Sequence, residues 1–142
     1  MKPALFLRLA SVFALMMAVL HTIGGVYGKP DPGPATNAVL AMQSNHFPVT
    51  GLDRTYWDFF IGFGLGITGF LVIEGIVFWL LASLAKENAA RLRPILVVFC
   101  LGYLGMAVLA WRYFFPPPLI SDLLIALCLG LAAATAKPVL SS

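Results

Sequence analysis

Polar and ionisable side chains gather at the ends of the long apolar segments of this sequence. If these segments are membrane helices that alternate in direction, the side chains come together at one membrane face. Ionisable groups are costly in lipid, so such a cluster is a candidate functional site. The members of this outer cluster are His21, Thr22, His46, Tyr56, Trp57, Asp58, Trp111, Arg112 and Tyr113.

A structural explanation of the outer cluster competes with a functional one. Thr55 and Asp58 have the spacing of a capping box, and Arg112 lies near a helix C-terminus, where its charge complements the helix dipole. The tryptophans and tyrosines would form an aromatic belt at the membrane interface. His21 fits this explanation least well, because it lies inside an apolar segment. The residue types leave both explanations open.

Two kinds of chemistry are compatible with the ionisable members of the cluster. His21 could act as acid or base while Arg112 holds an anionic group of a lipid-like substrate. Alternatively, His21 and His46 could be the axial ligands of a haem in a redox subunit. We also expect Asp58 and Arg112 to form a charge-assisted pair within reach of His21. These alternatives leave open whether the protein is an enzyme.

Glu74 is an ionisable residue in the middle of an apolar segment. It lies about 15 Å from the inner end of its helix at 1.5 Å per residue, and Tyr103 comes to a similar depth in the next helix. A charge at that depth is costly, so we expect Glu74 to be neutral and to hydrogen bond to Tyr103. Proton transfer or polarisation of a ligand is the alternative role.

The motifs of common soluble enzymes are missing from the sequence. It has no Gly-rich phosphate loop, paired-cysteine motif, zinc-ligand spacing or serine nucleophile elbow, and we expect no metal site. Cys100 and Cys128 fall at different depths of their helices. We therefore expect two buried thiols rather than a disulfide.

Four apolar segments must position these side chains. Of the 142 residues, 61% are hydrophobic and 11% are charged, and the mean hydropathy is +0.94, far from the values of soluble domains. Each segment is close to the roughly 20 residues that cross a bilayer. We predict an all-α, up-down bundle of four transmembrane helices, forming one domain over residues 1–142. The helices are predicted at 4–26, 57–85, 94–115 and 119–136.

The first segment follows Lys2 and Arg8, which is also the pattern of a secretory signal peptide. Its apolar stretch is long for a signal, however, and Val26 to Gly28 would be a poor cleavage site. We therefore expect this segment to be retained as a membrane helix.

The connection between the first two helices is predicted to contain a short amphipathic helix. Residues 29–34 include three prolines and a glycine, which favour turns. A helix over residues 38–46, capped by Thr36 or Asn37, would then lie on the outer membrane surface. Pro48 and Gly51 are expected to end it.

Small residues are predicted to mark the places where the helices pack. Lipid provides no hydrophobic drive for helix association, so close backbone contact must supply the attraction. The predicted contact positions are Gly62, Gly66 and Gly69, then Gly102 and Gly105, and finally Gly130 and Ala134.

Cations are distributed unevenly between the two ends of the predicted helices. Six of the nine lie on one side, which is cytoplasmic by the positive-inside rule. This places both termini and the turn at 86–93 in the cytoplasm, and it places residues 27–55 and a turn at Pro116 to Pro118 outside. The net charge of +3 is scattered and forms no basic patch, so we expect no nucleic-acid partner.

The outer cluster carries a resemblance to a known group. The residues that carry it are His21, Thr22, Gly24 and Gly25, then His46 and Phe47, then the run from Arg54 to Phe59, and finally the run from Trp111 to Phe114. This pattern resembles small uncharacterised bacterial four-helix membrane proteins, broadly DoxX-like in size and layout. The resemblance implies a multi-pass protein of the bacterial inner membrane and brings no established activity with it.

Taken with the outer cluster, these features predict an accessory or ligand-binding membrane protein. The expected ligand is a lipid or a quinone-like molecule, and the expected partners are membrane lipids, further copies of the chain or a larger membrane complex. A membrane-embedded enzyme acting on a lipid-like substrate, or a haem-binding redox subunit, is the alternative. No particular cofactor follows from the residues.

Overall fold

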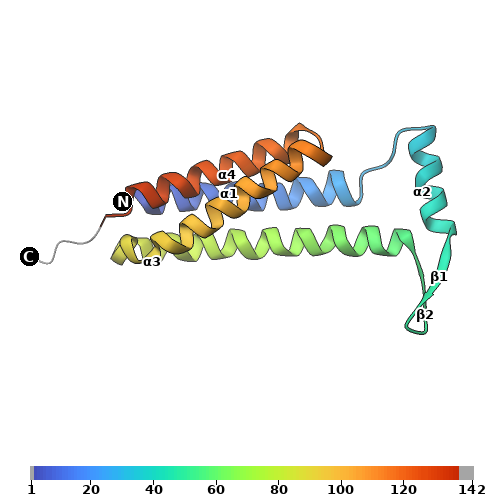
Figure 1. The fold of residues 1–142 in the computed structure, drawn as a ribbon, viewed down its shortest axis with the longest axis horizontal. Coiled ribbons are helices and arrows are strands. Elements are labelled where there is room, and N and C mark those ends of the chain that lie inside the picture. The colour runs from blue at the N-terminus through green and yellow to red at the C-terminus, as the bar shows by residue number, and fades with distance from the viewer. Residues whose placement is uncertain (1, 138–142) are drawn as a thin grey trace, which may run out of the picture. The chain divides into compact units, whose positions relative to one another are not determined.

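The computed structural model describes residues 2–137 of the chain, which are mostly helical (Figure 1). The helices are α1 (Lys2–Leu20), a π-helix (His21–Val26), α2 (Pro34–Ser44), α3 (Tyr56–Tyr113) and α4 (Pro116–Thr135). Two short strands, β1 (His46–Val49) and β2 (Leu52–Thr55), form an antiparallel hairpin before α3. The predicted cytoplasmic C-terminus and the ends of the predicted domain 1–142 lie outside the described residues.

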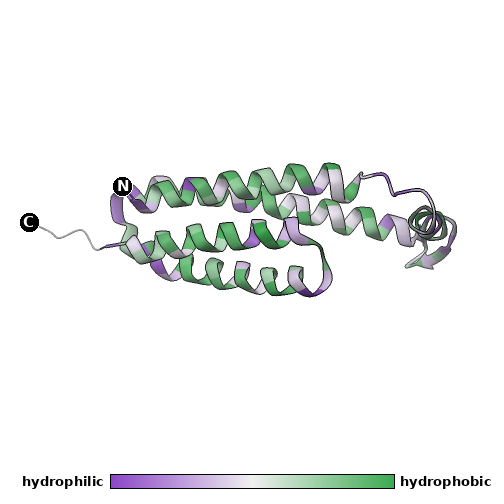
Figure 2. Cartoon of the chain, turned by 90° about the horizontal axis from the view of Figure 1, so that it is seen from above, coloured by the Kyte–Doolittle hydropathy of each residue, from purple (hydrophilic) through white to green (hydrophobic). Residues whose placement is uncertain are grey.

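Three helical segments among residues 2–137 are long and apolar enough to cross a membrane. They are Lys2–Val26, Tyr56–Tyr113 and Pro116–Thr135. Hydrophobic residues run along most of the length of these helices, whereas hydrophilic residues colour the hairpin and the connection before α2 (Figure 2). Large apolar side chains such as Phe63, Phe70 and Val98 are exposed on the helix surfaces. Exposed apolar surface on this scale indicates a membrane protein.

Helix α3 is a helical hairpin and not one rod. A straight helix of its 58 residues would be about 87 Å long, nearly three times the thickness of a hydrocarbon core. The backbone breaks at Asn88, where φ is −151° and ψ is 83°. Phe78, before the break, lies edge-on to Phe99, after it, with ring centroids 5.1 Å apart. The two halves of α3 therefore pack against each other at this level.

The break in α3 corrects two predicted helix bounds. Sequence reasoning ended one helix at residue 85 and began the next at Pro94, but helical backbone continues to the break and resumes directly after it. The Asn88 side chain accepts a hydrogen bond of 3.4 Å from the Arg91 N–H, as an N-cap residue does. The second half therefore starts at residue 89, and Pro94 lies inside it.

The start of α4 is also earlier than predicted. Pro116, Pro117 and Pro118 were expected to form a turn before residue 119, yet they are the first residues of the helix. Proline suits the first helical turn because its missing N–H would have no partner there and its φ angle is already helical.

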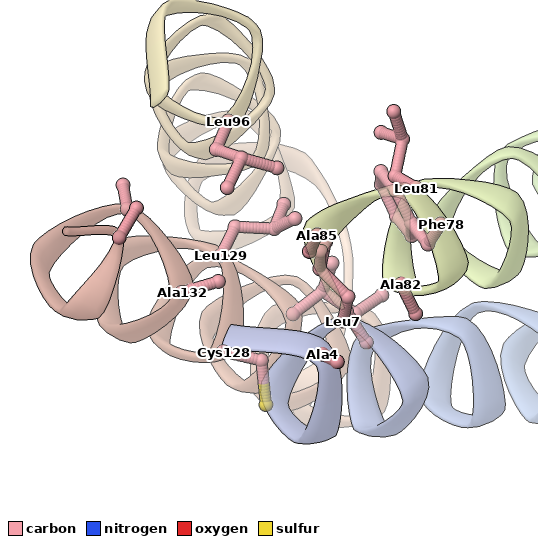
Figure 3. Close-up of a cluster of buried hydrophobic side chains, with 14 of the residues drawn as sticks. Ala4, Leu7, Phe78, Leu81, Ala82, Ala85, Leu96, Cys128, Leu129 and Ala132 are labelled. Carbon is pink, nitrogen blue, oxygen red and sulfur yellow. The ribbon is translucent and has the colours of Figure 1, made fainter. Parts of the chain in front are cut away.

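The chain forms two compact units. The first unit contains the described residues up to Met17 and those from Leu71 onward. Its core is formed by buried side chains, drawn in part in Figure 3. These side chains include Leu7 of α1, Phe78 and Leu96 of the two halves of α3, and Leu129 of α4. Four helical segments therefore share one apolar core.

Helix α1 packs closely within the first unit. The Ser11 hydroxyl donates a buried hydrogen bond of 2.6 Å to the Gly75 carbonyl of α3. A Cβ atom added at Gly75 would lie only 2.7 Å from the Leu15 side chain. Small alanines of α1, among them Ala10 and Ala14, are fully or almost fully buried. Helix α1 is therefore part of the core of this unit.

The close helix contacts do not fall at most of the predicted glycines. A Cβ atom added at Gly62, Gly66, Gly69, Gly102 or Gly105 would meet no described atom within 4 Å. The tight positions are Gly75 in the first unit and Gly64 in the second, where an added Cβ would lie 2.8 Å from Val26. Gly130 is the predicted glycine at which an added Cβ atom would make a contact, 3.5 Å from Cys100 Sγ.

The second unit, Ala18–Phe70, contains the short helix α2 and the β-hairpin. Helix α2 begins at Pro34, earlier than the predicted residue 38, and neither Thr36 nor Asn37 caps it. Thr36 instead donates to the Asp31 carbonyl over 2.9 Å. The N-cap of α2 is Gly33, whose φ of 112° suits glycine, and Pro34 then occupies the first helical position.

The β-hairpin was not predicted from the sequence. Its two-residue loop consists of Thr50 and Gly51, both with positive φ (49° and 84°), which is the pattern of a type I′ turn. The strands have only four residues each, and one contains Pro48. Both features weaken the alternating pattern by which strands are recognised.

Candidate functional site

The hairpin leads directly into a capped end of α3. The Thr55 N–H and hydroxyl donate to Asp58 Oδ2 over 2.7 and 3.0 Å, and the Asp58 N–H donates to Thr55 Oγ1 over 3.1 Å. These reciprocal bonds confirm the predicted capping box. Asp58 is therefore positioned by its own helix terminus, with Oδ2 taking both of the Thr55 bonds.

The hairpin is attached to this helix end by aromatic contacts. The Phe47 ring lies 4.7 Å from that of Tyr56 and stacks on Phe59 at 5.9 Å between centroids. His46 points elsewhere, with Nδ1 bonded to Asp53 Oδ2 over 2.8 Å on an exposed surface. The Arg54 guanidinium donates to the Asp53 carbonyl over 3.0 Å. The hairpin thus places cationic and anionic groups beside the first turns of α3.

A shallow, open groove of about 290 Å³ lies along these first turns. It is lined by Arg54, Asp58, Phe59, Gly62 and Phe63. The charged residues come from β2 and the capping box, and the apolar residues follow at helical spacing. The groove is therefore polar near the helix terminus and apolar further along the helix.

His21 and Thr22, at the start of the π-helix, contact the same helix at another place. His21 Nε2 lies 3.2 Å from the Gly64 carbonyl, and the Thr22 and Thr68 hydroxyls are 2.9 Å apart. The Thr22 hydroxyl oxygen also lies 2.7 Å from the Ala18 carbonyl oxygen, and the Thr68 hydroxyl oxygen lies 3.2 Å from the Gly64 carbonyl oxygen. These bonds form a polar seam between two apolar helices. π-Helical turns are rare and often occur at functional sites.

The haem hypothesis meets a competing contact at His21. Haem iron is held by an imidazole nitrogen, and the Nε2 atom of His21 is engaged by a backbone carbonyl. Ligation through that atom would have to break the bond. His46 is engaged through Nδ1 by Asp53. The structure contains no ligands, so haem binding stays a prediction.

The predicted bond between Glu74 and Tyr103 is confirmed. The Tyr103 hydroxyl donates to Glu74 Oε2 over 2.5 Å, linking the two halves of α3 within the first unit. Tyr103 is only 5% exposed. A buried phenol and a carboxyl group are therefore paired between the two halves of α3.

Trp111, Arg112 and Tyr113 lie at the end of α3 and are exposed. The Arg112 guanidinium lies over the Tyr113 ring, 5.6 Å from its centroid. These residues belong to the first unit, whereas His21 and Asp58 belong to the second. Convergence of the whole outer cluster, and the pairing of Asp58 with Arg112, therefore stay predictions.

Both cysteines are free thiols, as expected. Cys128 is buried, but Cys100 is half-buried and donates to the Ala126 carbonyl over 3.3 Å. The predicted role as a buried small hydrophobic residue is thus confirmed for Cys128 alone.

Sequence reasoning missed several residues that form the groove and the seam. Phe59, Gly62 and Phe63 share one face of α3 with Asp58, and this spacing was visible in the sequence. Arg54 could be assigned to the groove only once the hairpin was known. Gly64 and Thr68 carry no sequence signal that separates them from neighbouring small residues.

Comparison with known proteins gives no match to a family model, to a curated protein or to a solved structure. The DoxX-like resemblance therefore stays a prediction. The fold and the exposed apolar helices define the class, a small helical membrane protein.

Proposed function

We propose that this protein binds an amphipathic ligand, a lipid or a quinone-like molecule, in the groove at the start of α3. The groove itself is the observation that carries the proposal. It joins an arginine and a carboxylate to an apolar floor of Phe59, Gly62 and Phe63. Ligand sites commonly combine an apolar lining with a few polar groups that fix orientation.

The Arg54 guanidinium favours a ligand that carries a hydrogen-bond acceptor. It is exposed, and one of its nitrogens already donates to the Asp53 carbonyl, which holds the side chain in place. The remaining N–H groups can donate to a phosphate, a carboxylate or a quinone oxygen. Phe59 and Phe63 would contact the apolar part of the same molecule. A protein that only binds such a ligand would have an accessory role. It would act as a single chain, as an oligomer of this chain or within a larger membrane complex.

Arg54→Gln should weaken ligand binding about tenfold, because a charge-assisted hydrogen bond contributes about 1.5 kcal/mol or more. Phe63→Ala should also weaken it, through lost apolar contact. Short-chain phosphatidylglycerol and a short-chain quinone serve as probes, and native mass spectrometry of protein in mild detergent counts the bound molecules. Phe70→Ala is the matched control, since Phe70 and Phe63 are 70% and 71% exposed but only Phe63 lines the groove. Equal losses of bound probe in the Phe63→Ala and Phe70→Ala variants would mean that lipid binds non-specifically around the helices, and would contradict the proposal.

We further propose that the chain crosses the bacterial inner membrane four times with both termini in the cytoplasm. The break at Asn88 supports this, because it divides α3 into two segments that can each cross a bilayer. The excess of cations near the termini and around Asn88 supports the orientation.

Cysteine labelling tests this topology. In a background without Cys100 and Cys128, we expect a membrane-impermeant thiol reagent to label Gly33→Cys in intact spheroplasts and to leave Asn88→Cys unlabelled. Asn88→Cys should become reactive after the membrane is permeabilised. Labelling of position 88 but not of position 33 in intact spheroplasts would reverse the orientation.

A further inference from the structure

We infer that His21 Nδ1 accepts a hydrogen bond from the hydroxyl group of a membrane-soluble amphipathic molecule. This site is separate from the groove, which neither His21 nor Gly25 lines. It goes beyond the proposed function and does not depend on it.

The Gly64 carbonyl determines which nitrogen of His21 carries the proton. A carbonyl oxygen only accepts hydrogen bonds, so the Nε2 atom 3.2 Å away must be the donor. A charged imidazolium is costly in a membrane helix, which favours the neutral ring. A neutral imidazole has one N–H group, so Nδ1 of His21 presents a lone pair.

That lone pair has no partner within the described chain. Among residues 2–137, His21 makes its only side-chain hydrogen bond through Nε2. The two hydroxyls of the polar seam cannot supply a donor, because each has a single hydrogen. The acceptors beside the Thr22 and Thr68 hydroxyls are the Ala18 carbonyl, the Gly64 carbonyl and the other hydroxyl, which are more than enough to engage both hydrogens.

Gly25 leaves the Nδ1 atom accessible. A Cβ atom added at Gly25 would lie 3.2 Å from Nδ1, closer than most Cβ contacts. Gly25 itself is exposed, so the space beside the imidazole opens to the surroundings of the helix. An acceptor that faces lipid without a partner is unfavourable, and a donor from outside the chain removes this cost.

Membrane amphiphiles carry two kinds of donor, hydroxyl and ammonium groups, and the neutral hydroxyl costs less to remove from water beside an apolar helix. The headgroup glycerol of phosphatidylglycerol is one source, and the hydroxyl of a quinol is the other. Phosphatidylcholine has neither an O–H nor an N–H donor, so a bilayer of this lipid serves as the background without a lipid donor.

Nitrogen-15 NMR of the histidines tests the inference in nanodiscs of phosphatidylcholine. We expect His21 to have a protonated Nε2 and an unprotonated Nδ1. Addition of phosphatidylglycerol or of a short-chain quinol should shift the Nδ1 resonance saturably and leave Nε2 in place. Whichever additive produces the shift identifies the source. In the Arg54→Gln variant, in which the groove should bind weakly, His46 is the internal control and should not respond.

Gly25→Ala should abolish the saturable Nδ1 shift, because its methyl group would occupy the space beside the nitrogen. Gly24→Ala is the matched control, since a Cβ atom there meets nothing within 4 Å. A protonated Nδ1 in the unmodified protein would overturn the inference. So would an Nδ1 resonance that neither additive shifts, which would leave water as the partner. Both readings come from the unmodified protein and do not require either variant to fold.

Discussion

Gly75→Leu should destabilise the protein by about 2 to 3 kcal/mol, the largest loss that we expect from a single substitution, because it overpacks a closed contact. An added Cβ atom already lies 2.7 Å from Leu15 Cδ2 and Cγ and 3.4 Å from the Ser11 carbonyl. A leucine would force α1 away from α3 within the first unit. It would also stretch the buried bond from the Ser11 hydroxyl to the Gly75 carbonyl.

Titration with a denaturing detergent, followed by circular dichroism, measures this loss in the free energy of unfolding. Gly105→Leu is the matched control, because Gly105 also lies in α3 and an added Cβ atom there meets no described atom within 4 Å. Both substitutions remove a helical glycine, so the gain in helix propensity is shared and the difference reports packing. Equal stabilities of the two variants would show that α1 does not approach α3 closely at Gly75.

Glu74→Leu should cost about 1 to 2 kcal/mol, because it removes an interhelical hydrogen bond in the membrane. The buried Tyr103 hydroxyl would lose the carboxyl oxygen to which it donates. Glu74→Gln should be tolerated, since the amide oxygen can still accept from Tyr103. Tyr103→Phe should cost less in the Glu74→Leu background than in the unmodified protein, because the bond is then already absent.

Tyr113→Phe is the control for this cycle, since the Tyr113 side chain is exposed. Infrared spectroscopy tests the protonation of Glu74 directly. We expect a band of a protonated carboxyl group that Glu74→Gln removes, because charge in the middle of the membrane is costly. If Glu74→Gln removed an ionised carboxylate band instead, the neutral state would be disproved. Loss of ligand binding in Glu74→Gln without loss of stability would point to the alternative role, polarisation of a ligand.

Features that depend on one helix or on depth in the membrane were predictable from the sequence. The reciprocal bonds of Thr55 and Asp58 follow from a spacing of three residues. The Glu74 to Tyr103 bond follows from counting residues inward from a turn, since antiparallel helices place equal counts at equal depth. The class of membrane protein likewise follows from the length and polarity of the segments.

Features that depend on helix rotation were not predictable in this way. Every long segment is apolar on all sides, so no hydrophobic stripe identifies the face that meets a neighbour. Glycine spacing therefore suggested Gly62, Gly66 and Gly69, whereas the close contact in that region falls at Gly64. The irregular turn of the π-helix changes the rotation of His21 and Thr22 further, and no residue in it signals this change.

The sequence alone thus determined that the chain is built from membrane-length apolar helices, because length and polarity are local properties that lipid selects directly. It also located the cap of α3 and the bond between Glu74 and Tyr103. The tertiary structure decided that Arg54 joins an apolar groove and that His21 bonds to Gly64. The first depends on a hairpin of two four-residue strands, and the second depends on the rotation of the helices about their axes. Neither the short hairpin nor the helix rotation produces a periodic pattern of residues in the sequence.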